Sequence, residues 1–245
     1  MGDEHTKYAL FGDINQTINQ YAGSSSALFR KIALEADNYQ LTCTMRCPKK
    51  VVEFVNIYFP ELNFQAHENN IEGYVGNCDL KDLLERCKSL KEKETLYVMN
   101  TKNTPLFQIY LYMIKNGINP TLKGSDIQDY ILKLLKGCKT LSELKVKISK
   151  ILGFSYKSLK SVYSELSPNK IHSHDAFKKH NEPIEILFAL LEFYFDINFE
   201  NETLPEISIE TIEKQIRTVY SNTNKSNITL LTCHKSKGME ADYVY

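Results

Sequence analysis

The segment TCHKSKGME, at residues 232–240, concentrates groups that can bind phosphates, sugars or bases. These groups are a hydroxyl, an imidazole, two ammonium groups and a carboxylate, carried by Thr232, His234, Lys235, Lys237 and Glu240. Gly238 stands among them, and a residue without Cβ lets the backbone approach a ligand closely. The carboxylate of Glu240 can accept hydrogen bonds from a sugar hydroxyl. This density of polar groups directly after an apolar run indicates a binding loop.

A second polar segment, GDINQ at residues 12–16, ends the apolar run KYALFGD. Ligands bind at the carboxyl ends of strands in open α/β sheets, and the amide of Gln16 can contact a phosphate oxygen and a water at once. An ordinary β-turn explains the same glycine and aspartate without a ligand. Tyr21, further along, can stack on a nucleobase if it is exposed, or belong to the core if it is buried.

Arg46 is the third candidate, because it follows the apolar run YQLTCTM directly. Its planar guanidinium can form a charge-assisted, two-pronged contact with a phosphate. A surface ion pair is the alternative role for this arginine. A helix is expected next, and Pro48 suits its first turn.

The elements that carry these loops alternate between short apolar runs and helical patterns. The order strand, helix, strand, helix is expected over residues 7–59, with a serine cap at the start of the first helix, in SSSALFRKIALEA. The runs ETLYVMN and TPLFQIYLYMIKNG repeat that unit, and Gly117 is the expected C-terminal cap. Such alternation predicts an α/β fold in which helices lie on both faces of a parallel sheet.

Helical spacing replaces this alternation over residues 126–222, and strand signals nearly vanish there. Apolar strand character returns in ITLLT, directly before the segment TCHKSKGME. The simplest organisation is a parallel α/β sheet domain interrupted by an α-helical insertion. The expected helices are GSDIQDYILKLLKG, LSELKVKISKIL, SYKSLKSVYSEL, NEPIEILFALLEFYF and SIETIEKQIRTVYSN.

Composition limits the remaining possibilities. Lysine plus arginine and aspartate plus glutamate both number 30, so any contact with nucleic acid must be local rather than a matter of bulk charge. Six cysteines without a CxxC pair favour a reduced, cytoplasmic protein, and no apolar run approaches the roughly 20 residues of a membrane span. Cys43 and Cys47, and the run IHSHD, contain residue types that can bind a metal. Neither group is followed by a second pair of ligands at zinc-type spacing, so no metal site is predicted.

Taken together, these segments resemble the motifs of UvrD/Rep-type superfamily 1 DNA helicases. GDINQTINQYAG is similar to motif III, LTCTMRCPKKVVEFVN to motif IV, and ITLLTCHKSKGMEADYVY to motif V, whose pattern T-x-H-x-x-K-G-x-E is complete. The resemblance covers about residues 6–60 and 227–245. It implies a RecA-like second motor domain (2A-like), discontinuous over 1–125 and 223–245 and incomplete at its C-terminal end, with residues 126–222 as its helical insertion (2B-like).

The resemblance also implies roles for the candidate residues. Gln16 would sense the terminal phosphate of ATP, Arg46 would act as an arginine finger, and Gly238 and Glu240 would lie at the nucleotide. Thr232, His234, Lys235 and Tyr21 would lie on the DNA side. The implied partners are single-stranded DNA or a duplex junction, the first RecA-like domain, and no membrane.

No GxxxxGK[ST] loop and no acidic DExx motif occur in this sequence. In the family, these parts hold the phosphates of ATP and Mg²⁺, so the chain is expected to be a fragment that holds neither fully and is inactive alone as an ATP hydrolase. The alternatives are a catalytically inactive helicase-like remnant that acts as a protein- or DNA-binding module, and an unrelated nucleotide-binding α/β domain.

Overall fold

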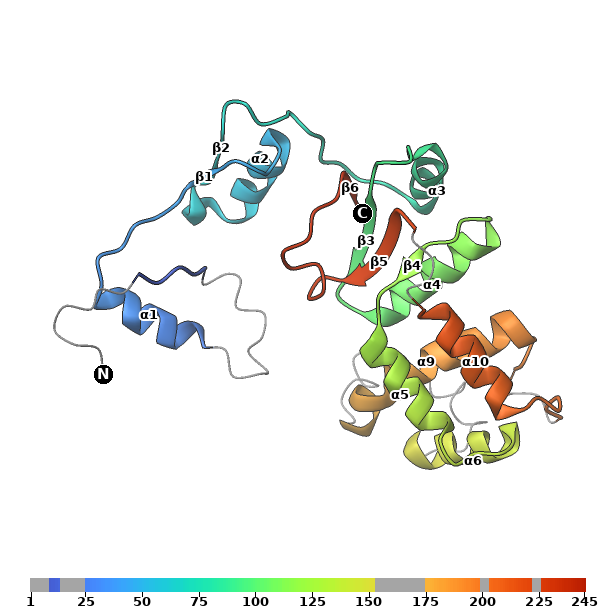
Figure 1. Ribbon diagram of the computed structural model, residues 1–245. Coiled ribbons are helices and arrows are strands. Elements are labelled where there is room, and N and C mark those ends of the chain that lie inside the picture. Colours follow the sequence, from blue (N-terminus) through green and yellow to red (C-terminus); the bar gives the residue numbers. More distant parts are fainter. Residues whose placement is uncertain (1–8, 14–24, 153–174, 199–202, 222–225) are drawn as a thin grey trace. The chain divides into compact units, whose positions relative to one another are not determined.

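The computed structural model describes residues 9–13, 25–152, 175–198, 203–221 and 226–245, with side chains from 182 onward in the third range (Figure 1). The chain divides into two compact units, Met1–Asn77 and Cys78–Tyr245. Both contain parallel strands and helices, so the chain is a mixed α/β protein. None of the helices in the described part of the chain combines the length and apolarity needed to cross a membrane.

The described residues of the first unit form two α-helices and a short two-stranded parallel sheet. Its elements are α1 (Ser26–Leu34), β1 (Cys43–Thr44), α2 (Lys49–Tyr58), the 3₁₀ helix η3 (Pro60–Leu62) and β2 (Gln65–Ala66). The hydroxyl of Ser25 caps α1 by accepting a hydrogen bond from the backbone N–H of Leu28 at 3.2 Å. The start of this helix was predicted from the sequence and is confirmed.

The described residues of this unit form fewer and shorter strands than the sequence predicts. Residues 9–13 of the expected first strand are not a strand, and the strand expected in YQLTCTM shrinks to the two residues of β1. The strand prediction for residues 9–13 is therefore wrong. A strand needs a neighbour for its backbone N–H and C=O groups. Within the described part of this unit, only β1 and β2 pair with each other.

The second unit is built on a four-stranded sheet in the order β4–β5–β3–β6, with every neighbouring pair parallel. Its strands are β3 (Leu96–Asn100), β4 (Thr121–Leu122), β5 (Ile228–Thr232) and β6 (Tyr243–Val244). The two central strands run in register from the pair Leu96 and Ile228 to the pair Asn100 and Thr232. Every residue of β5 is buried, in keeping with its largely apolar sequence ITLLT.

Six helices accompany this sheet in the described residues. They are α3 (Leu80–Ser89), α4 (Asn103–Lys115), α5 (Ser125–Leu135), α6 (Leu141–Leu152), α9 (Asp175–Phe195) and α10 (Ile209–Val219). Gly117 follows α4 with φ 76°, the left-handed conformation expected of a C-terminal glycine. Over residues 126–222, the described residues contain helices and no strand, as the sequence predicts. The expected helix SYKSLKSVYSEL lies outside the described residues.

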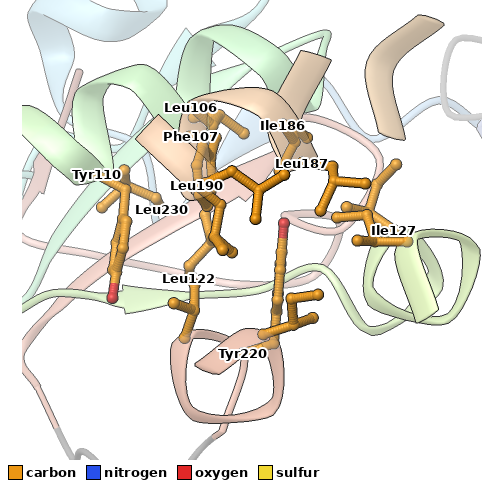
Figure 2. Packing of buried hydrophobic residues seen from close by; sticks show 14 of the residues in the cluster. Leu106, Phe107, Tyr110, Leu122, Ile127, Ile186, Leu187, Leu190, Tyr220 and Leu230 are labelled. Carbon is orange, nitrogen blue, oxygen red and sulfur yellow. The ribbon is translucent and has the colours of Figure 1, made fainter. Parts of the chain in front are cut away.

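One hydrophobic core joins the sheet to the helices of residues 126–222, which are called the helical segment below. Buried side chains of α4, α5, α9 and both central strands belong to a single packed cluster. Figure 2 shows part of it, with Leu187 and Leu190 of α9, Leu106 and Phe107 of α4, and Leu230 of β5. Helix α9 also packs on α5 and α6. The helical segment is therefore continuous with the sheet through α4 and α9.

Candidate functional site

Three polar segments leave the carboxyl edge of the four-stranded sheet. Strand β3 ends at Asn100, β4 at Leu122 and β5 at Thr232, and all three point the same way because they are parallel. This edge is where open α/β sheets bind ligands. The residues that follow β5 are those that the sequence singles out as a binding loop.

The loop after β5 folds into consecutive turns through Gly238. The carbonyl of Thr232 accepts hydrogen bonds from the backbone N–H groups of Lys235 at 2.9 Å and Ser236 at 3.2 Å. The Ser236 hydroxyl donates to the carbonyl of Cys233 at 2.8 Å, and the N–H of Cys233 donates to the carbonyl of Asn100 at 3.0 Å. These bonds fix the loop to the ends of both central strands.

Gly238 ends these turns with φ 77°, in the left-handed region. A Cβ at this position would meet no other atom within 4 Å. The backbone conformation itself therefore explains the glycine, since a left-handed φ is costly for residues with a Cβ.

The side chains of this loop differ in access to solvent. Thr232 is 7% exposed, whereas His234 and Glu240 are exposed. The structure thus presents the imidazole and the carboxylate at the surface and keeps the threonine at the end of the buried strand. Glu240 lies on the segment that runs from Gly238 towards β6.

Lys235 is paired with a carboxylate that the sequence analysis missed. Its ammonium donates to Asp126 Oδ1, in the first turn of α5. Burial raises the pKa of Asp126, but the hydrogen bond and charge of Lys235, with the backbone N–H groups of Asp126 and Ile127, outweigh it and hold this pKa below its ordinary value. The ion pair ties the loop to the beginning of the helical segment.

Lys123 approaches the same loop from the end of β4. Its Nζ lies 3.8 Å from Sδ of Met239, and its backbone N–H donates to the carbonyl of Leu230 at 2.9 Å. The loop is thus bordered by two lysine side chains and one aspartate. An ammonium group of either lysine is of the kind that binds a phosphate by a charge-assisted hydrogen bond.

The N-terminus of α4, at the end of β3, is occupied by carboxylates from α9. Glu182 accepts from the backbone N–H of Asn103 at 3.3 Å and from its side-chain amide at 3.0 Å, and Glu185 accepts from the Thr104 hydroxyl at 2.9 Å. A carboxylate satisfies a helix N-terminus by charge and by hydrogen bonding. Sequence reasoning missed Glu182, because a contact between residues so far apart leaves no local pattern.

Arg46 lies in the first unit, in the turn between β1 and α2, and is exposed. The Thr44 hydroxyl accepts from the backbone N–H groups of Arg46 and Cys47, both at 3.3 Å. The side-chain amide of Asn70 donates to the carbonyls of Thr44 at 2.8 Å and Cys47 at 2.9 Å. This turn therefore has a defined backbone, which places Arg46 directly before a helix as the sequence predicts.

Helix α2 has its own backbone partners at its N-terminus. The N–H groups of Lys49 and Lys50 donate to the carbonyls of Ile71 at 3.0 Å and Glu72 at 2.9 Å. Asn56, near the end of this helix, exchanges two hydrogen bonds with the backbone of Phe64, at 2.8 and 3.0 Å. The asparagine of the motif IV-like segment thus has a structural role in holding the chain that enters β2.

Two of the predicted site residues, Gln16 and Tyr21, lie outside the described residues. Within the ranges that the structure covers, no group of three or more histidine, cysteine, aspartate or glutamate side chains is arranged to hold a metal ion.

No protein-family model matches this chain, and no curated protein matches it in sequence.

Proposed function

We propose that this chain supplies the second half of the ATP site and part of the single-stranded DNA track of an ATP-dependent DNA helicase or translocase of the UvrD/Rep type. The observation that carries the proposal is the position of TCHKSKGME, the most specific of the three motif-like segments. It leaves a fully buried parallel strand at the carboxyl edge of a sheet. A ligand-binding loop of an α/β motor requires this position.

The proposal assigns a role to each candidate site residue. His234 and Lys235 contact DNA, and buried Thr232 supports them through its carbonyl, which accepts from the N–H of Lys235, while Gly238 and Glu240 lie towards the nucleotide. Arg46 stabilises the negative charge that develops on the transferred phosphoryl group, which a guanidinium does well because it is always charged and binds oxygens in pairs. Gln16 senses the terminal phosphate, and Tyr21 stacks on a base.

ATP and Mg²⁺ are the substrate and metal of the proposed reaction. A phosphate loop and an acidic Mg²⁺-binding motif from the first RecA-like domain complete the site. The closing of two such domains around ATP would move the DNA-binding loop along the strand. The same proposal includes the division of the chain into domains. Residues 1–125 and 223–245 form the second motor domain, and residues 126–222 form its helical insertion.

The test is ATP hydrolysis by the full-length protein, measured with and without single-stranded DNA. Arg46→Ala is expected to lower kcat by about 10³-fold or more, the scale of an arginine finger. Arg30→Ala is the matched control, because Arg30 is an exposed arginine of α1 in the same unit. It should leave turnover unchanged.

DNA-stimulated turnover that collapses only in Arg46→Ala supports the proposal. Equal turnover in Arg46→Ala and the wild-type protein contradicts the role of Arg46. A folded full-length protein without turnover contradicts the motor function itself, and the chain would then act as a protein- or DNA-binding module.

A further inference from the structure

Asp126 lies on a helix that is anchored in the core. The backbone N–H groups of Asp126 and Ile127, in the first turn of α5, stabilise its carboxylate. Helix α5 is itself anchored by buried Ile127, Ile131 and Leu135. Lys235, in contrast, lies in a loop of turns and reaches the carboxylate through a long, flexible side chain. The pair therefore joins a helix that is anchored in the core to the loop after β5.

The pair is open to solvent and to other anions. The side chain of Lys235 is 30% exposed and that of Asp126 is 59% exposed. Exposed ion pairs are weak, changing an equilibrium constant by only about 1.4- to 5-fold. A phosphate offers the ammonium a charge-assisted bond of the same kind. The contact can therefore be exchanged for a nucleic-acid phosphate at little cost.

Resting on the function proposed above, we infer that Asp126 competes with the phosphates of single-stranded nucleic acid for the Lys235 ammonium. In the free protein the carboxylate holds Lys235 against α5, so the Lys235 ammonium is not available to bind DNA. Binding replaces Asp126 by a phosphate. Asp126 thus sets the affinity of the loop and links its occupancy to the first turn of the helical segment.

The experiment measures binding of a labelled oligothymidine to the full-length protein by fluorescence anisotropy at several KCl concentrations. Asp126→Asn removes the competing charge while keeping an oxygen acceptor at the helix start. Asp129→Asn is the matched control, since Asp129 is an exposed aspartate of the same helix and changes the net charge equally. Thermal unfolding of each variant checks that it is folded.

Asp126→Asn is expected to bind oligothymidine about two- to fivefold more tightly, while Asp129→Asn changes affinity much less. The slope of log K against log [salt] should stay the same, because Lys235 contacts one phosphate in both complexes and each such contact to a single strand contributes about 0.7. In a Lys235→Gln background, Asp126→Asn should have no more effect than Asp129→Asn. A gain of affinity is the decisive readout, because damage to the fold would lower affinity.

Equal affinities of the two aspartate variants, or weaker binding by Asp126→Asn, would overturn the inference while leaving the proposed function intact. A gain that persists in the Lys235→Gln background would overturn it as well, since the effect would not pass through the pair. If neither the folded wild-type protein nor any variant binds oligothymidine, the proposed DNA track fails and the inference fails with it.

Discussion

Truncation of Leu187 to alanine tests whether the sheet and the helical segment unfold as one cooperative body. Leu187 lies in α9 and Leu230 in β5; both are 0% exposed and both belong to the same core cluster (Figure 2). If that cluster is continuous in solution, a cavity at either site must destabilise both elements. Leu187→Ala and Leu230→Ala should therefore shift the same unfolding transition.

The burial of these side chains sets the size of the effect. Replacing a fully buried leucine by alanine costs about 2–5 kcal/mol, because apolar contact is lost and a cavity remains. For a body of this size, each kcal/mol lowers Tm by about 2–4 °C, so a loss of about 3 kcal/mol predicts a fall of about 6–12 °C. Val146→Ala is the control, because Val146 in α6 is 54% exposed and its truncation should cost less than about 0.5 kcal/mol.

The assay is differential scanning calorimetry, combined with hydrogen exchange of the β5 amides. Leu187→Ala should lower the protection of β5 by the same free energy by which it lowers global stability. Two separate transitions, one sensitive only to Leu187→Ala and the other only to Leu230→Ala, would refute the reasoning. The helical segment would then be an independent domain that merely touches the sheet.

Three further predictions concern single contacts. Glu182→Gln should destabilise the second unit by about 1 kcal/mol in urea unfolding, because it removes the charge at the start of α4, whereas Glu192→Gln on the exposed side of α9 should not. Thr95 donates to the Asp242 carboxylate through its backbone N–H and hydroxyl and holds the pKa of Asp242 below its ordinary value. That stabilisation is present above about pH 4 and is lost as the pH falls through the lowered pKa, so Asp242→Asn should flatten the acid side of a pH–stability profile. Gly73→Ala should destabilise the first unit, seen as increased proteolysis there, because Gly73 has φ 71° and its Cβ would stand 2.4 Å from the Cβ of the proline before α2.

In the second unit, the strands, helices and helix ends that local sequence patterns predict are present in the structure. Strands β3 and β5 form where the sequence has the short, largely apolar runs LYVMN and ITLLT, and Gly117 follows α4 with the expected left-handed φ. Helices α5 and α10 each bury one apolar stripe at helical spacing. These features depend on residues that are neighbours in the chain, so periodicity and capping rules predict them.

Contacts between distant residues could not be predicted in the same way. The pair of Asp126 and Lys235 joins residues 109 positions apart, and the two-residue length of β1 depends on the partner strand β2. Asp126 did carry one usable signal, because it follows a strand-to-helix junction and parallel strands bring their carboxyl ends to one edge. Nothing in the local sequence marks Glu182 as the cap of α4.

A contact between Gly124 and Tyr220 links the two ends of the helical segment. Gly124 stands at the entry, as the N-terminal cap of α5, and a Cβ on it would lie 2.9 Å from a ring carbon of Tyr220, which ends α10 at the exit. Tyr220 is buried, and burial raises the pKa of its phenol. Because the Tyr220 ring packs against Gly124, α5 cannot turn at its start without disturbing that ring. Since the first turn of α5 also holds Lys235 through Asp126, any such turn must move or release the loop after β5.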